Sequence, residues 1–290
     1  MCKNYQEDKN WFYIDNRRAM VSLGPLSDKK TCPFSCAFCY VQDGFISYAR
    51  KNIEDIVDFL VKYRTEYDIV YISGDTDSFA KPRTEMGIFL LQRIAQKIDC
   101  DLLFTTRTVF SDDELVRIKN IVEILNEKNK KLYACISITR YSDSMSYLEP
   151  KPIPTPTMRI ETLKRLHNIG AITVLAMRPF LPIVPKEDYF EILDCTKSFV
   201  DIVLGETFYF VPEGNIEKRV FLNGLPEEIE SELERNVQMD FDKNNKEWTV
   251  WHPVVLEKEI SNYCERNGVI FSMRSSKAID TFKNKKTSNN

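Results

Sequence analysis

The sequence lacks any long hydrophobic run. Hydrophobic residues make up 43% of the 290-residue chain, yet no apolar stretch approaches the roughly 18 residues that a membrane-spanning helix needs. The amino terminus also lacks the charged-then-apolar pattern of a secretory signal peptide. We therefore expect a soluble, cytoplasmic protein whose eight cysteines stay reduced and which has no membrane partner.

An excess of positive charge is also absent. The 40 lysines and arginines are outnumbered by 43 aspartates and glutamates, which gives a net charge of -3. A protein that binds nucleic acid through its phosphates normally presents a basic face. The composition therefore favours a small-molecule or peptide substrate, and nucleic acid stays an alternative only through a local basic groove.

Histidine is scarce, and cysteine is concentrated in one place. The chain has only two histidines, His167 and His252, whereas the run Cys32-Pro-Phe-Ser-Cys36-Ala-Phe-Cys39 places three thiols within eight residues. A [4Fe-4S] cluster held by three cysteines keeps one iron open to another ligand. A structural zinc site needs a fourth ligand, for which the nearest unused candidates are Cys2 and Cys100. Zinc, a disulfide and a chance group of core cysteines remain as alternatives.

Strand-like and helix-like segments alternate from residue 19 to about residue 205. Such an alternation is typical of a parallel sheet in an α/β protein, and the chain length suits one barrel. The expected strands cover residues 19–23, 68–73, 102–106, 132–138, 172–177 and 200–204. The expected helices cover about 53–61 and 84–97, then a helix from the capping box at Ser111, a helix from Thr157 to Gly170, and 186–199.

Outside this core the pattern is weaker. We expect an N-terminal segment at 1–18, a core barrel at 19–205 and a C-terminal extension at 206–276 that packs on the barrel. The lysine-rich residues 277–290 are expected to form a disordered tail.

The alternation of side chains along two strands predicts which residues face the barrel interior. Apolar residues are expected to face the outer helices, and polar residues at the carboxyl ends of strands are expected near the reactive rim. The outward set is Val70, Ile72, Ala134, Ile136 and Ile138, and the inward set is Tyr71, Ser73, Asp75, Tyr133, Cys135, Ser137 and Thr139.

The cysteine run, with Phe38 before its last cysteine, resembles the signature of the radical S-adenosylmethionine (SAM) enzymes. Further segments in the same order extend the resemblance to the spore photoproduct lyase-like branch, over roughly residues 19–205. These segments are Ser73-Gly-Asp-Thr-Asp77, Thr105-Thr-Arg107, Ile136-Ser-Ile-Thr139, Leu148-Glu-Pro150, the helix at 159–170 and Pro179-Phe-Leu-Pro182.

The resemblance implies a fold, two cofactors and an activity. The fold is a partial (β/α)6 TIM-type barrel, and Cys32, Cys36 and Cys39 hold a [4Fe-4S] cluster whose open iron chelates SAM. The reduced cluster splits SAM into methionine and a 5'-deoxyadenosyl radical, with an electron donor such as flavodoxin or ferredoxin. The implied cofactor contacts are Phe38, Tyr40, Ser73, Gly74, Asp75, Asp77, Ser137, Thr139 and Arg178.

Several of these assignments have a plain structural alternative. Tyr40 also suits a packing role beside the cluster. Arg107 and Arg178 suit either a clamp for a carboxylate or phosphate or an ordinary salt bridge, and Glu206 either touches substrate or pairs with a cation. No catalytic residue is assigned. The alternative function is a non-catalytic iron-sulfur or metal-binding regulatory protein on the same barrel.

One departure separates this chain from the lyase branch. Spore photoproduct lyase uses a hydrogen-donating cysteine close to the second-strand motif, whereas this chain has no cysteine between Cys39 and Cys100. Cys135, inward on the fourth strand, is the one substitute that the sequence offers. We therefore do not expect thymine-dimer repair by the lyase's own route.

Overall fold

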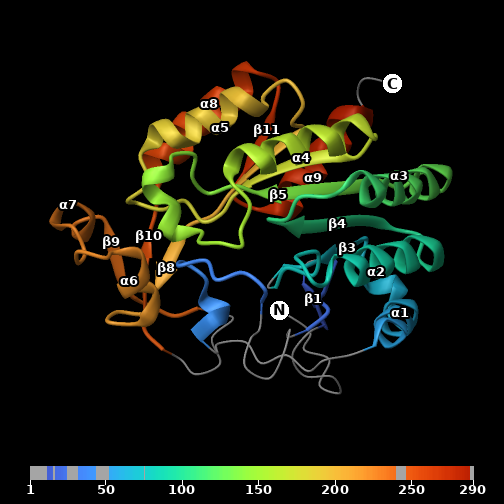
Figure 1. The fold of residues 1–290 in the computed structure, drawn as a ribbon, viewed down its shortest axis with the longest axis horizontal. Coiled ribbons are helices and arrows are strands. Elements are labelled where there is room, and N and C mark those ends of the chain that lie inside the picture. Colours follow the sequence, from blue (N-terminus) through green and yellow to red (C-terminus); the bar gives the residue numbers. More distant parts are fainter. Residues whose placement is uncertain are drawn as a thin grey trace.

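Six parallel strands form the centre of the molecule in a computed structural model that describes residues 12–15, 17–24, 32–43, 52–74, 76–239 and 246–287 (Figure 1). The predicted bounds of these strands agree with the structure within two residues. In chain order they are β2 (Arg18–Val21), β3 (Ile69–Ile72), β4 (Asp101–Thr106), β5 (Leu132–Ser137), β6 (Ile172–Met177) and β7 (Ile202–Gly205).

The sheet extends by one strand at each edge and stays open. β1 (Phe12–Asp15) pairs antiparallel with β2, and β11 (Ile270–Ser272) pairs parallel with β7. The order is β1-β2-β3-β4-β5-β6-β7-β11, and within the described chain its two edge strands do not pair with each other. The predicted α/β fold with a partial barrel is therefore confirmed.

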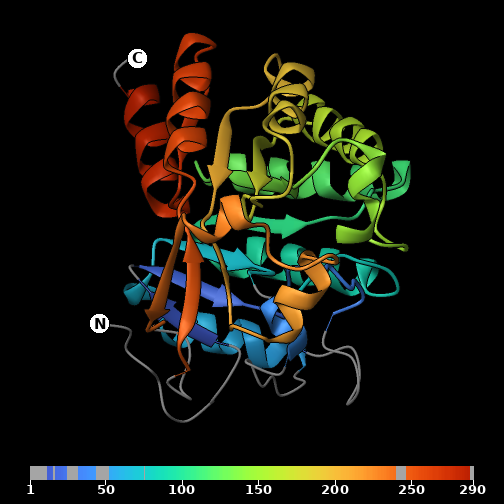
Figure 2. The same ribbon diagram turned by 90° about the vertical axis from the view of Figure 1, so that its left-hand side faces the viewer.

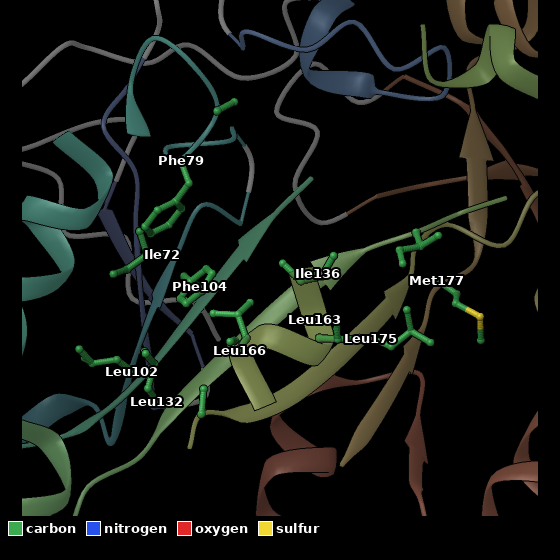
Figure 3. Close-up of a cluster of buried hydrophobic side chains, with 14 of the residues drawn as sticks. Ile72, Phe79, Leu102, Phe104, Leu132, Ile136, Leu163, Leu166, Leu175 and Met177 are labelled. Carbon is green, nitrogen blue, oxygen red and sulfur yellow. The ribbon is translucent and has the colours of Figure 1, made fainter. Parts of the chain in front are cut away.

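Five helices connect successive parallel strands, as the hydrophobic periodicity predicts. They are α1 (Ile53–Lys62), α2 (Thr84–Lys97), α3 (Asp112–Glu127), α4 (Pro156–Asn168) and α5 (Lys186–Thr196). Their apolar faces and the outward side chains of the sheet form one buried layer. Figure 3 shows part of this layer, in which Ile136 and Leu175 lie near Leu163 and Leu166 of α4, and Ile72 and Phe104 lie near Phe79.

The opposite face of the sheet forms a second buried cluster. Tyr71, Tyr133 and Cys135 lie in this cluster, whereas Val70 and Ile136 lie in the outer layer. The predicted alternation along β3 and β5 is therefore confirmed for these residues. Neighbouring strands stay in register, since Tyr71 of β3 aligns with Leu103 of β4, which aligns with Tyr133 of β5.

The expectation of a disordered tail is wrong for the residues described. Helix α9 (Ser275–Thr287) covers most of residues 277–290. Its side chains Ala278, Ile279 and Phe282 are buried in the inner cluster, and the Phe282 ring lies 6.0 Å from that of Tyr133 in an edge-to-face contact. The last helix therefore fills the interior of the open barrel.

The segment after β7 forms a small second sheet before it returns to the main one. Antiparallel strands β8 (Phe208–Phe210), β10 (Trp248–Trp251) and β9 (Leu233–Val237) make this sheet. Helices α6 (Asn215–Val220), α7 (Glu227–Glu230) and α8 (Val254–Arg266) complete the segment. Figures 1 and 2 show β8 and α6, in orange, beside the blue segment that follows β2. The split into a core and an extension stays a prediction, although β11 belongs to the main sheet.

None of the helices in the described part of the chain combines the length and the apolar character needed to cross a membrane.

Candidate cofactor site

The three clustered cysteines lie in a loop, residues 32–43, that follows β2 and ends in a 3-10 turn (Tyr40–Asp43). All three line one cavity of about 300 Å³ together with side chains from the carboxyl ends of β3 to β6. Small-molecule sites have volumes of about 300 Å³ and more. In barrels of this kind the reactive groups lie at the same ends of the strands. The cavity is therefore a suitable place for a small cofactor next to the thiols.

Three cysteine thiols on one cavity suit a cluster. No three His, Cys, Asp or Glu side chains in the described part of the chain are placed around one ion, and the seven described cysteines are free of disulfides. A zinc ion needs four donors within about 2.3 Å of one centre, whereas a cluster binds each thiolate through a different iron. The zinc and disulfide alternatives therefore have no support in these ranges.

Burial keeps the cysteines protonated while no cation is bound. Burial raises the pKa of Cys32 to about 11, and the nearby Asp77 carboxylate adds to this shift. Burial also raises the pKa of Cys36 to about 12, against the opposing charge of Arg107. Metal ligation requires thiolates, so binding of cationic iron would release protons from these groups.

Most of the predicted cofactor contacts line the cavity. They are Phe38, Tyr40, Ser73, Gly74, Asp77, Ser137 and Arg178. Asp75 lies outside the described residues. Thr139 does not line the cavity, because its side chain is buried and its hydroxyl donates to Glu149 Oε1 at 2.8 Å. The structure therefore places Thr139 behind the cavity lining, and its contact with a cofactor stays a prediction.

Two residues in the turn after β3, Ser73 and Gly74, have a constrained backbone. Ser73 adopts a positive φ of 69°, which is uncommon for a residue with a side chain. Its hydroxyl oxygen accepts a hydrogen bond from the Ser78 N–H at 2.9 Å. A Cβ atom on Gly74 would lie 2.6 Å from Met20 Cε and 3.1 Å from the Tyr71 ring. A glycine at position 74 therefore keeps this wall of the cavity open.

Asp77 uses its carboxylate to hold the protein together. Its two oxygens accept hydrogen bonds from the backbone N–H groups of Phe79, Ala80 and Arg107 and from the Thr106 hydroxyl, at 2.8 to 3.0 Å. Its own N–H donates to Cys32 Sγ at 3.5 Å. Burial raises the pKa of Asp77, although these hydrogen bonds act in the opposite direction. Asp77 thus joins β3, β4 and the cysteine loop.

Arg107 connects the cysteine loop to a buried charge network. Its guanidinium lies 5.4 Å from the centroid of the Phe38 ring, and its Nε donates to Glu149 Oε1 at 3.2 Å. Arg159 of α4 donates to both carboxylate oxygens of Glu149. Arg107 therefore makes one of the two predicted interactions, an internal ion pair, and it also lines the cavity.

Arg178, unlike Arg107, donates hydrogen bonds to two neutral backbone carbonyls. Its Nε donates to the Gly205 carbonyl at 3.1 Å, and Nη2 donates to the Met273 carbonyl at 3.3 Å. Glu206 lines the same cavity, and Tyr71 donates or accepts a hydrogen bond with Thr105 at 2.8 Å on the cavity wall. A guanidinium in this position has N–H donors that suit an anionic group of a ligand.

The sequence did not predict that the C-terminal segment builds part of the wall. Phe208, Tyr209 and Ser275 line the cavity, and the Tyr209 ring lies 5.7 Å from that of Tyr40. Ser275 accepts a hydrogen bond from Arg18 Nη1 at 3.0 Å. The aromatic run at 208–210, directly after Glu206, is a local signal for the first two residues, but no local pattern marks Ser275.

Comparisons with solved structures agree on the fold. Spore photoproduct lyase with bound SAM and dinucleoside spore photoproduct has a TM-score of 0.61 and 16% identity, over 83% of this chain and 73% of that chain. A second structure of that lyase has a TM-score of 0.63 and 15% identity, and the match covers 83% of this chain and 73% of that chain. The radical SAM methyltransferase TsrM from Kitasatospora setae was solved with tryptophan and a SAM analogue bound. It has a TM-score of 0.51 and 10% identity, and the match covers 79% of this chain and 48% of that chain.

No protein-family model and no curated protein matches the sequence. The agreement therefore rests on three-dimensional structure, together with the cysteine loop at the carboxyl ends of the strands. The chain has the fold of the radical SAM enzymes, in the form that spore photoproduct lyase shows.

Proposed function

We propose that this protein is a radical SAM enzyme that acts on a small-molecule or peptide substrate. The observation that carries the proposal is the position of Cys32, Cys36 and Cys39 on one cavity at the carboxyl end of an open radical SAM barrel. A [4Fe-4S] cluster bound there would supply one electron that cleaves SAM into methionine and a 5'-deoxyadenosyl radical, which takes a hydrogen atom from the substrate.

The residues of the chain would then bind, orient and shield the reactants. Ser73, Gly74 and Ser137 lie where they can contact SAM through backbone and hydroxyl groups. Arg178 is suited to a carboxylate of SAM or of the substrate. Phe38 and Tyr40 would pack against the cofactors and exclude water. Asp77 contributes through its backbone and through the loop that it fixes.

The substrate is proposed to differ from that of spore photoproduct lyase. That lyase binds a dinucleoside spore photoproduct, but this chain lacks a cysteine between Cys39 and Cys100. Cys135 is fully buried and is not among the residues that line the cavity. A hydroxyl such as that of Ser73 does not replace a thiol as hydrogen-atom donor, because its O–H bond is much stronger than an S–H bond.

Iron binding tests the proposed cofactor directly. Protein reconstituted anaerobically with iron and sulfide should carry about four irons per chain, and the Cys32→Ala/Cys36→Ala/Cys39→Ala variant should lose the iron and the visible absorbance. Cys195→Ala is the matched control, because Cys195 is another partly exposed cysteine that is not among the cavity residues. Wild-type iron content in the triple variant would refute the cluster assignment.

A further inference from the structure

Helix α6 of the C-terminal segment carries an arginine that reaches the cysteine loop. The helix is fixed by its apolar face, since Ile216 and Val220 are buried. The Tyr147 hydroxyl donates to the Val220 carbonyl at 3.0 Å and gives α6 a polar anchor. Phe221, directly after the helix, packs against the Phe208 and Phe210 rings at 6.1 and 5.8 Å. The position of Arg219 is therefore set by the packing of α6.

The guanidinium of Arg219 binds two backbone carbonyls of the loop. Its Nε donates to the Ala37 carbonyl at 2.9 Å, and Nη2 donates to the Cys39 carbonyl at 3.2 Å. These two carbonyls lie on either side of Phe38, so the contact fixes the stretch from Ala37 to Cys39, which contains one of the three thiols and directly follows Cys36. Two directed donors on one planar group suit arginine and not lysine.

Contacts from several other elements also hold the loop. No strand or helix covers residues 32–39. The Ala37 N–H donates to the Leu148 carbonyl at 2.9 Å, and Gln42 Nε2 donates to the Cys36 carbonyl at 3.0 Å. Arg107 approaches from the barrel side over Phe38. Arg219 adds a tether from α6 of the C-terminal segment.

We propose that Arg219 is a positioning residue, which holds the Cys36–Cys39 stretch ready for the cluster and stabilises the reduced cluster through its positive charge. The proposal deepens the proposed function, on which its second part rests. It also means that α6 contributes to cofactor binding although it lies outside the parallel strands. Reduction makes a cluster more negative, so a nearby cation raises its reduction potential.

The first part is tested in iron-free protein by hydrogen–deuterium exchange. Arg219→Gln should speed exchange of the amides between residues 36 and 41 several-fold, because both carbonyl tethers are lost. Lys218→Gln is the matched control, since Lys218 is an exposed cation on the same helix and its removal should leave this stretch unchanged. Equal exchange in both variants and the wild type would overturn the positioning role.

The second part is tested by the midpoint potential of the reconstituted cluster. Arg219→Gln should shift the midpoint potential to more negative values and speed the loss of iron to a chelator. Arg219→Lys keeps the positive charge, so its potential should lie close to that of the wild type. Its amides between residues 36 and 41 should still exchange faster than in the wild type, because lysine lacks the planar pair of donors. A potential equal to that of the wild type in Arg219→Gln would overturn the electrostatic role. If the wild type itself binds no iron, the proposed function fails, but the exchange experiment still decides the positioning role.

Discussion

Glu149 is a buried carboxylate that joins several polar side chains behind the candidate site. Its oxygens accept hydrogen bonds from Arg107, Thr139 and Arg159. Burial alone would raise the pKa of Glu149, but the charge of Arg159, together with Arg107 and the Thr139 hydroxyl, lowers it to about 2. Arg107 also lies over the Phe38 ring. The network therefore contacts the cysteine loop through Arg107.

The network predicts how stability depends on pH. The pKa of Glu149 is lower in the folded protein than in the unfolded chain, so its ionised form stabilises the fold above about pH 4.5. That contribution, about 3 kcal/mol in the free energy of unfolding, should be lost as the pH falls from about 4.5 towards 2. Urea unfolding of the wild type between pH 7 and about pH 3 should show the loss.

Replacement of the carboxylate provides the comparison. Glu149→Gln should be less stable at neutral pH by about 3 to 5 kcal/mol, because the buried Arg159 loses its counterion, and its stability should change less in acid. Glu161→Gln removes an exposed carboxylate and should stay within about 0.5 kcal/mol of the wild type. Parallel acid profiles for Glu149→Gln and the wild type would exclude this role.

At the residue scale, local spacing could predict a metal-binding role for the three cysteines, but it could not predict which residues contact their loop. The three thiols lie within eight residues, and that spacing is itself the signal. The partners of the loop lie far away in sequence. Arg219 is about 180 positions from Ala37 and Cys39, and its contacts depend on the packing of α6. Alternation along one strand could not predict that Thr139 donates to Glu149.

At the scale of elements, periodicity predicted the strands and most helices well. Buried parallel strands and amphipathic helices carry their pattern within the element itself. The start of α4 was displaced by two residues, because Thr155 and not Thr157 caps the helix and Pro156 occupies its first turn. Helix α9 was missed since its lysines dominate the composition, while only Ala278, Ile279 and Phe282 of its inner face are buried in the inner cluster.

The α9 helix can be tested through its largest buried side chain. Phe282→Ala should lower the free energy of unfolding by about 3 kcal/mol, because the Phe282 ring is buried against Tyr133 in the inner cluster. Lys285→Ala, at an exposed position of the same helix, should change it by less than about 0.5 kcal/mol. Chemical denaturation measures both. Equal stabilities would mean that residues 275–287 do not pack inside the barrel.

At the scale of the whole molecule, early and late segments of the chain meet around the cavity. Arg18 at the start of β2 donates to Ser275 at the start of α9, and the Met273 carbonyl accepts from Arg178. The sheet is open, so these contacts connect its first parallel strand to its last segment. Long-range pairing of this kind leaves no local pattern, which is why the sequence predicted the barrel but not how its interior is filled.

The central claim is that this cavity supports radical SAM chemistry, and the most direct test is formation of 5'-deoxyadenosine. Reconstituted protein should produce 5'-deoxyadenosine and methionine from SAM with dithionite under anaerobic conditions, and the triple cysteine variant should produce neither above background. Dinucleoside spore photoproduct should yield little or no thymine. Absence of 5'-deoxyadenosine from wild-type protein that carries a full complement of iron would contradict the account and favour a non-catalytic iron-sulfur protein.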